Sequence, residues 1–199
     1  MHLRWKLAQA LADQPGGIGR VWEHQLLAQE IGRLVGRAAG QRGQHVEQIG
    51  AQGGRRNQAQ RLDQAIKEYL VVLALDPNRP DTHHNLGVVY AIKGWTNRAI
   101  DEYKIALALQ PHFAMAHSNL ALAFIRHGLL DQAIEECKTA LTLDPNLADA
   151  YHNLGIAYAM QGRAGEAISE LNKAATLNPD NQTYRDNLAK AWALKKAND

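Results

Sequence analysis

Residues 83–111 read HHNLGVVYAIKGWTNRAIDEYKIALALQP, and this pattern returns twice downstream. Residues 117–145 read HSNLALAFIRHGLLDQAIEECKTALTLDP, and residues 151–179 read YHNLGIAYAMQGRAGEAISELNKAATLNP. Each copy begins 34 residues after the one before it. A fixed period of this length is typical of a repeat array, in which each unit packs mainly against its neighbours.

Each copy is predicted to form two antiparallel helices joined by a tight turn. In the first copy, Leu86 and Tyr90 lie on one apolar stripe at helical spacing. Gly94 follows where a left-handed glycine commonly ends a helix. Tyr103 belongs to the apolar stripe of a second helix, and Pro111 ends that helix because proline cannot continue it.

Small residues mark the places where the paired helices should touch. Gly87 and Ala99 lie on the facing sides of the first and second helix, and a larger side chain there would overpack the joint. One helix pair cannot bury its apolar face alone, so neighbouring pairs must stack. The sequence therefore predicts an all-α fold built as a solenoid.

These positions closely resemble the signature of the tetratricopeptide repeat (TPR) family. In the first copy that signature falls on His83, Leu86, Gly87, Tyr90, Ala99, Tyr103, Ala106 and Pro111, and in the other copies it lies 34 and 68 residues further on. The resemblance covers residues 80–181. It implies a right-handed α-solenoid of stacked antiparallel helix pairs, with full repeats over residues 80–113, 114–147 and 148–181.

The segments that flank the three repeats fit the same register. Residues 61–77 resemble the second helix of a partial repeat, and residues 182–197 resemble a C-terminal capping helix with polar side chains for water. We therefore expect one TPR domain over residues 61–199.

Residues 1–60 have a different composition. They hold 10 of the 16 glycines, 10 glutamines, and 8 Lys and Arg against 4 Asp and Glu. Residues 3–12 and 20–39 are predicted to be helical, and residues 40–60 to be a poorly ordered linker. We interpret residues 1–60 as an atypical Gly/Gln-rich N-terminal extension that is partly helical. The alternatives are a degenerate first repeat or a stretch that is not natural coding sequence.

The TPR resemblance implies that the first helices line a concave groove for a protein or peptide. Residues of this groove should recur with the repeat, and those predicted to bind are Asn85, Asn119, Asn153, Asn187, His84, Met115, Leu122, Arg126, His152, Ile156, Met160 and Lys190. The four asparagines form an asparagine ladder, similar to that in the TPR region of O-linked N-acetylglucosamine transferase. A side-chain amide both donates and accepts, so the ladder could hold peptide backbone without reading its sequence.

Another TPR class clamps the C-terminal carboxylate of heat-shock chaperones with Lys and Arg on this face. Asn85, Asn119 and Asn153 lie where some of those cations would be expected, with His84 as the nearest substitute. The sequence therefore argues against that ligand. Arg126 and Lys190 still leave an acidic or mixed peptide as a candidate.

Composition and motifs argue against other functional classes. The net charge of +2 does not favour nucleic-acid binding, and no apolar run is long enough for membrane insertion. No catalytic motif or phosphate loop occurs, so we expect neither an enzyme nor a cofactor. His84 and His152 lie two repeats apart, too far to share a metal ion, and Cys137 reads as a core residue. The lack of targeting signals and disulfides favours the cytoplasm.

The leading hypothesis is a protein–protein interaction scaffold that binds an extended peptide or helix of a partner in the concave groove. The alternative is a self-assembling structural TPR protein, or a regulatory TPR segment of a larger system.

Overall fold

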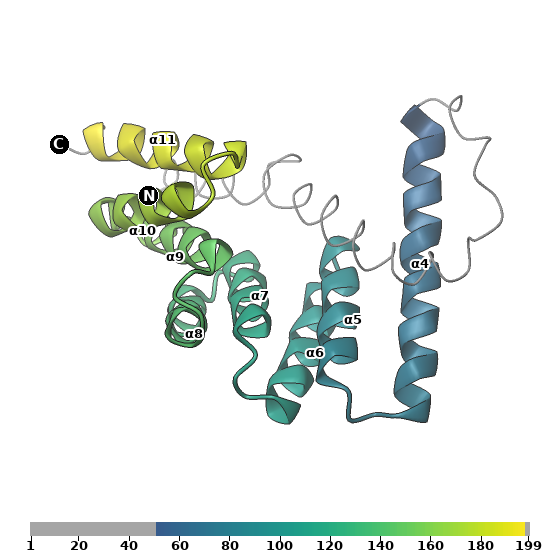
Figure 1. Ribbon diagram of the computed structural model, residues 1–199. Helices are drawn as coiled ribbons and strands as arrows, with labels where there is room; N and C mark the ends of the chain where they lie inside the picture. The colour runs from purple at the N-terminus through teal and green to yellow at the C-terminus, as the bar shows by residue number, and fades with distance from the viewer. Residues whose placement is uncertain (1–50, 198–199) are drawn as a thin grey trace.

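The computed structural model describes residues 51–197, and the regular secondary structure over this range is entirely helical. Figure 1 shows helix pairs stacked one after another between α4 at one end and α11 at the other. The helices are α4 (Ala51–Leu75), α5 (Pro80–Ile92), α6 (Thr96–Leu109), α7 (Ala114–Arg126), α8 (Leu130–Leu143), α9 (Ala148–Met160), α10 (Ala164–Leu177) and α11 (Gln182–Lys196). The predicted all-α solenoid of antiparallel helix pairs is confirmed.

Glycines form the tight turns inside the three pairs. Gly94, Gly128 and Gly162 have φ angles of 76°, 72° and 80°, in the left-handed region that glycine adopts without steric cost. Each follows the last turn of a first helix and reverses the chain into the second helix. The turn position predicted from the sequence is confirmed in all three repeats.

The contact inside each pair depends on matched side-chain sizes. Gly87 faces Tyr103, and a Cβ atom built on Gly87 would lie 2.6 Å from the tyrosine ring. Gly155 faces Leu171 at the same register, where a Cβ atom would lie 2.6 Å from Leu171 Cγ. The middle repeat carries the larger Ala121 in this place, and there the second helix has the small Cys137. A small residue on one helix therefore compensates for a large one on the other.

The first helix of the described range starts earlier than the sequence predicted. The expected second helix over residues 61–77 is the C-terminal part of α4, which begins at Ala51 and ends at Leu75. Residues 51–60 are therefore helical and not part of a linker. Residues 55–60 contain neither proline nor glycine, so nothing in them ends the helix. The predictions for residues 3–12, 20–39 and 40–50 lie outside the described residues.

The first helices contact one another along the stack. α5 touches α7, α7 touches α9 and α9 touches α11, whereas successive second helices approach less closely. Closer spacing on one side curves the stack and puts the first helices on its inner side. In residues 51–197 we find no helix that combines the length and the apolar character required for crossing a bilayer.

The size matching inside the pairs can be tested by filling one glycine. We expect Gly155→Ala to lower the free energy of unfolding by about 1–3 kcal/mol, because the added methyl group overlaps Leu171. Adding Leu171→Cys recreates the Ala121–Cys137 pair. The free energy of unfolding should therefore fall less in the double variant than the two single variants' losses add up to. Urea unfolding of the four chains measures this coupling.

Gly165→Ala is the matched control, because a Cβ atom on Gly165 meets nothing within 4 Å. Its stability should stay the same or rise by up to about 1 kcal/mol, since alanine favours helix over glycine. Strictly additive losses at residues 155 and 171 would contradict the size matching.

Candidate functional site

The asparagine ladder lies on the first helices, but most of it is not open to solvent. Asn119, Asn153 and Asn187 expose 5%, 2% and 3% of their surface, and only Asn85 is half-buried. The three buried side chains each reach back 35 residues to the first helix of the preceding repeat. They therefore join neighbouring repeats, which differs from the open row of amides that the sequence predicted.

The contacts of these three asparagines follow one pattern. Asn153 Nδ2 donates to the hydroxyl and the carbonyl oxygen of Ser118, at 3.2 Å in both cases. Asn119 and Asn187 make the corresponding contact to a histidine: their Nδ2 atoms lie 2.8 Å from Nε2 of His84 and His152. Every junction between full first helices from α5 to α11 thus carries one side-chain amide contact.

The two histidines at these junctions are neutral. An amide nitrogen can only donate, so Nε2 of His84 accepts, and Nδ1 carries the proton toward Asn85 Oδ1 at 3.3 Å. Burial lowers the pKa of His84 to about 4, although the hydrogen bond with Asn85 and the charge of Asp81 act in the opposite direction. Burial likewise lowers the pKa of His152 to about 4. The repeat junctions therefore exclude the imidazolium form.

Several predicted groove residues belong to the packed junctions. His84 and His152 are buried, and Leu122 and Ile156 expose only 8% and 1% of their surface. These four side chains are therefore not open anchors for a ligand. The next repeat packs against each first helix. The sequence pattern alone does not show which side chains of the first helix that repeat buries.

Other predicted groove residues remain accessible. Met115 exposes 39% of its surface, Arg126 is exposed, and Met160 and Lys190 are half-buried. Arg126 donates from Nη1 to the Ala91 carbonyl oxygen at 3.1 Å. Lys190 Nζ lies 3.4 Å from Asn187 Oδ1. The accessible part of this face thus combines thioether side chains with cations that are held by the preceding helix or by the ladder.

Sequence reasoning missed a second repeated contact. His83 Nδ1 lies 2.7 Å from Glu102 Oε2, and its Nε2 lies 3.0 Å from the Pro77 carbonyl oxygen. His117 repeats both contacts one repeat later, with Glu136 at 2.6 Å and the Pro111 carbonyl oxygen at 2.9 Å. The recurrence of a histidine and a glutamate 19 residues apart was the available signal.

The pKa of His117 moves in the opposite direction from that of the buried histidines. Burial disfavours its charged form, but the hydrogen bonds with Glu136 and with the Pro111 carbonyl oxygen outweigh burial and raise the pKa. This contact therefore ties the turn before α7 to α8 most strongly when His117 is protonated.

Cys137 is fully buried, so the prediction of a core residue is confirmed. Burial raises the pKa of its thiol, which keeps the thiol protonated. In the part of the chain that the structure describes, no three His, Cys, Asp or Glu side chains gather in a way that could hold a metal ion.

Known protein families match most of the solenoid. The TPR repeat family matches residues 53–94 and 126–162, and two further tetratricopeptide repeat families match residues 80–113 and 148–181. No curated protein matches the chain. The similarity of the ladder to that of O-linked N-acetylglucosamine transferase stays a prediction.

Solved structures show the same fold. MamA is 29% identical, with a TM-score of 0.61 over 72% of this chain and 79% of MamA. The Arabidopsis OM64 TPR domain is 24% identical, with a TM-score of 0.56 over 57% of this chain and 94% of that domain. The first TPR of Spaghetti (RPAP3), bound to the HSP90 peptide SRMEEVD, is 24% identical, with a TM-score of 0.56 over 59% and 94%. At that identity the last two report the fold alone.

Removing a junction amide should destabilise the stack. We expect Asn153→Ala to lower the free energy of unfolding by about 1–3 kcal/mol, because the buried Ser118 groups lose their partner. Asn172→Ala is the matched control: Asn172 is exposed on α10, so water can replace its amide and the loss should be smaller. Thermal unfolding followed by circular dichroism compares the two. An equal loss in both variants would contradict a special role for the junction amide.

Acid should weaken the stack through the two buried histidines. Their folded pKa of about 4 lies below the ordinary 6.5, so the unfolded chain takes up protons that the folded chain excludes. The stability they confer is complete above pH 6.5 and is lost as the pH falls through 4. His84→Ser with His152→Ser copies Ser118 and should flatten the fall in unfolding free energy over that range.

His112→Ser is the control, because His112 is exposed in the turn between α6 and α7. Urea unfolding at several pH values measures the difference between each variant and the unchanged chain. An unaltered pH dependence in the double serine variant would contradict neutral junction histidines.

Proposed function

Because this chain is a tetratricopeptide repeat protein, we propose that it is a protein-interaction scaffold whose first helices bind an extended segment or a helix of a partner. The observation that carries the proposal is the continuous row of α5, α7, α9 and α11 on the inner side of the stack. Met115, Arg126 and Lys190 provide accessible apolar and cationic contacts along this row. In the Spaghetti domain, which shares the fold, an HSP90 peptide is bound.

The asparagine ladder would contribute acceptors and not donors. The amide nitrogens of Asn119 and Asn153 are used at the repeat junctions, while no hydrogen bond within residues 51–197 involves their Oδ1 atoms. Among the described side chains, no fully buried polar atom lacks a partner, so both oxygens must reach solvent. An extended peptide can donate its backbone N–H groups to oxygens of this kind.

Charges on the same row favour a mixed peptide over a terminal carboxylate. Arg126 and Lys190 are cationic, whereas Asp81 and Asp186 are exposed acids. His84 does not supply a further cation, because its pKa of about 4 keeps it neutral near pH 7. A carboxylate clamp needs several converging cations, so we propose a partner segment that carries apolar side chains and charges of both signs.

The proposal can be tested by capture from a lysate with the full chain as bait. Met115→Asp should reduce the captured partner, because it puts a charge and a shorter side chain into the groove. Ile105→Asp is the matched control: Ile105 exposes 41% of its surface, against 39% for Met115, but lies on the second helix α6. Mass spectrometry quantifies the partner in each sample.

Equal capture by both variants and the unchanged chain would contradict groove binding. A catch that contains only the protein itself would favour self-assembly instead. Asn119→Ala and Asn153→Ala are less suitable here, because they remove junction contacts as well as ladder oxygens.

A further inference from the structure

A pocket lies on the side of the stack formed by the second helices. It has a volume of about 440 Å³ and is lined by Lys104 of α6, Phe124 of α7, and Asp131, Gln132, Glu135 and Glu136 of α8. None of these residues belongs to the row of first-helix side chains proposed above to bind a peptide. The pocket combines an aromatic ring with three carboxylates and one cation.

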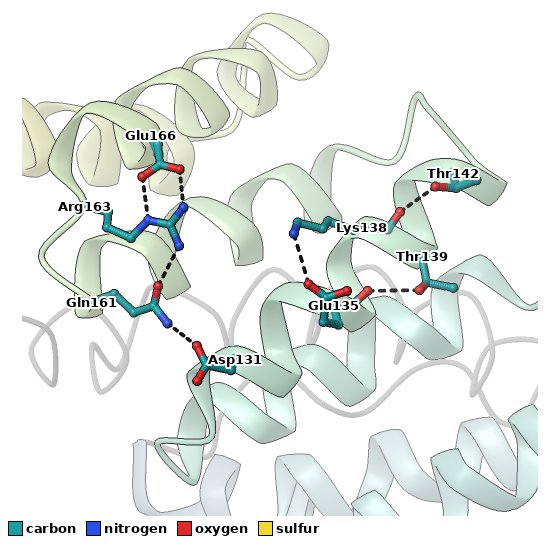
Figure 2. Close-up of polar contacts among 8 residues, drawn as sticks. All are labelled: Asp131, Glu135, Lys138, Thr139, Thr142, Gln161, Arg163 and Glu166. Carbon is teal, nitrogen blue, oxygen red and sulfur yellow. Dashed lines mark hydrogen bonds and ion pairs between the residues drawn. The ribbon is translucent and has the colours of Figure 1, made fainter.

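The aromatic position of this pocket recurs in the flanking repeats, where the chain covers the ring with its own arginine. The guanidinium carbon of Arg163 lies 4.3 Å from the ring centre of Tyr158. Arg163 also donates to both carboxylate oxygens of Glu166 and to Gln161 Oε1, as Figure 2 shows. In the first repeat, Arg98 lies 5.8 Å from the ring centre of Tyr90.

The middle repeat has no such arginine at either position. Leu129 occupies the place of Arg163, and Gln132 occupies the place of Arg98, each at a distance of 34 residues in the sequence. Among the described side chains, Lys104 lies over the ring of Phe124, with its Nζ atom 6.0 Å from the ring centre. The middle repeat therefore keeps the aromatic ring, but neither the guanidinium of Arg163 nor the carboxylate of Glu166, whose place Gln132 takes. Its own acids, Asp131 and Glu135, lie at other positions of the repeat.

The carboxylates around the pocket are held in position by neighbouring side chains. Asp131 Oδ1 accepts from Gln161 Nε2 at 2.7 Å, and Glu135 Oε1 accepts from Lys138 Nζ at 3.0 Å, both visible in Figure 2. Glu136 Oε2 lies 2.6 Å from His117 Nδ1. Each contact uses one oxygen, so the second oxygen can accept from a ligand.

We propose that this pocket binds an arginine side chain of a partner protein, which contacts the small exposed part of Phe124, 6% of its surface, and pairs with Asp131 and Glu135. A comparable arrangement occurs inside the chain one repeat later, where Arg163 lies over Tyr158 and pairs with Glu166, a carboxylate from a different position of the repeat. With Lys138 counted beside Glu135, three acids face two lysines, so the pocket keeps a net negative charge for a cation. A planar guanidinium can pair with a carboxylate while it lies against an aromatic side chain. This surface lies apart from the proposed groove and would let the scaffold hold a second, basic partner.

The test is a titration of the full ¹⁵N-labelled chain with the blocked tripeptide Ac-Gly-Arg-Gly-NH2, followed by NMR. We expect saturable shifts of the backbone amides of Phe124 and of residues 131–136. The citrulline analogue has nearly the same shape without the charge, and should cause no such shifts. Asp131→Asn with Glu135→Gln should weaken binding by about twofold to thirtyfold, the range for two exposed ion pairs.

Two further variants separate this pocket from general charge effects. Lys104→Met should strengthen binding by about twofold, because it removes the competing cation from the rim. Asp186→Asn removes an exposed acid on the first-helix row and should leave the affinity unchanged. Equal shifts with the citrulline peptide, or affinity that is unaffected by the Asp131 and Glu135 changes, would overturn the proposal.

Discussion

A helix pair of this chain cannot bury its own apolar surface, so every repeat depends on the junction with the next one. At each junction a buried asparagine amide reaches back 35 residues, from Asn119 to His84, from Asn153 to Ser118 and from Asn187 to His152. A buried amide contact requires one register, because a shifted pairing would leave polar groups without partners. The junction amide thus complements the apolar packing, which alone sets the register less strictly.

This constraint shapes what the inner face can offer a ligand. Once the amide nitrogens hold the repeats together, only the oxygens remain for a bound segment. The histidines at two junctions are neutral and add no positive charge to the inner face. Side chains such as Arg126 and Lys190 supply that charge instead. Under the proposed function, structure and recognition would share the same ladder, and a substitution there would affect both.

The middle unit differs from its two neighbours at the helix contact and beside the aromatic ring of Phe124. Ala121 with Cys137 replaces the glycine and large side chain of the flanking repeats, which keeps the helix contact filled. Leu129 and Gln132 take the places of Arg163 and Arg98, and among the described residues the cation over the ring of Phe124 is Lys104. The first change preserves packing, whereas the second puts an uncharged side chain where a flanking repeat has an arginine, next to the pocket at Phe124.

The repeat period, the helix pairs and the glycine turns could all be predicted from the sequence, because each follows from local spacing and backbone preference. Gly94, for example, ends a helix through its own φ angle. The burial of His84, Leu122 and Asn153 could not be predicted, since it depends on how closely the neighbouring repeat approaches. Only the tertiary structure decides that distance, because it results from the sum of side-chain volumes across each junction. It therefore also decides which first-helix residues reach solvent and which join the repeats.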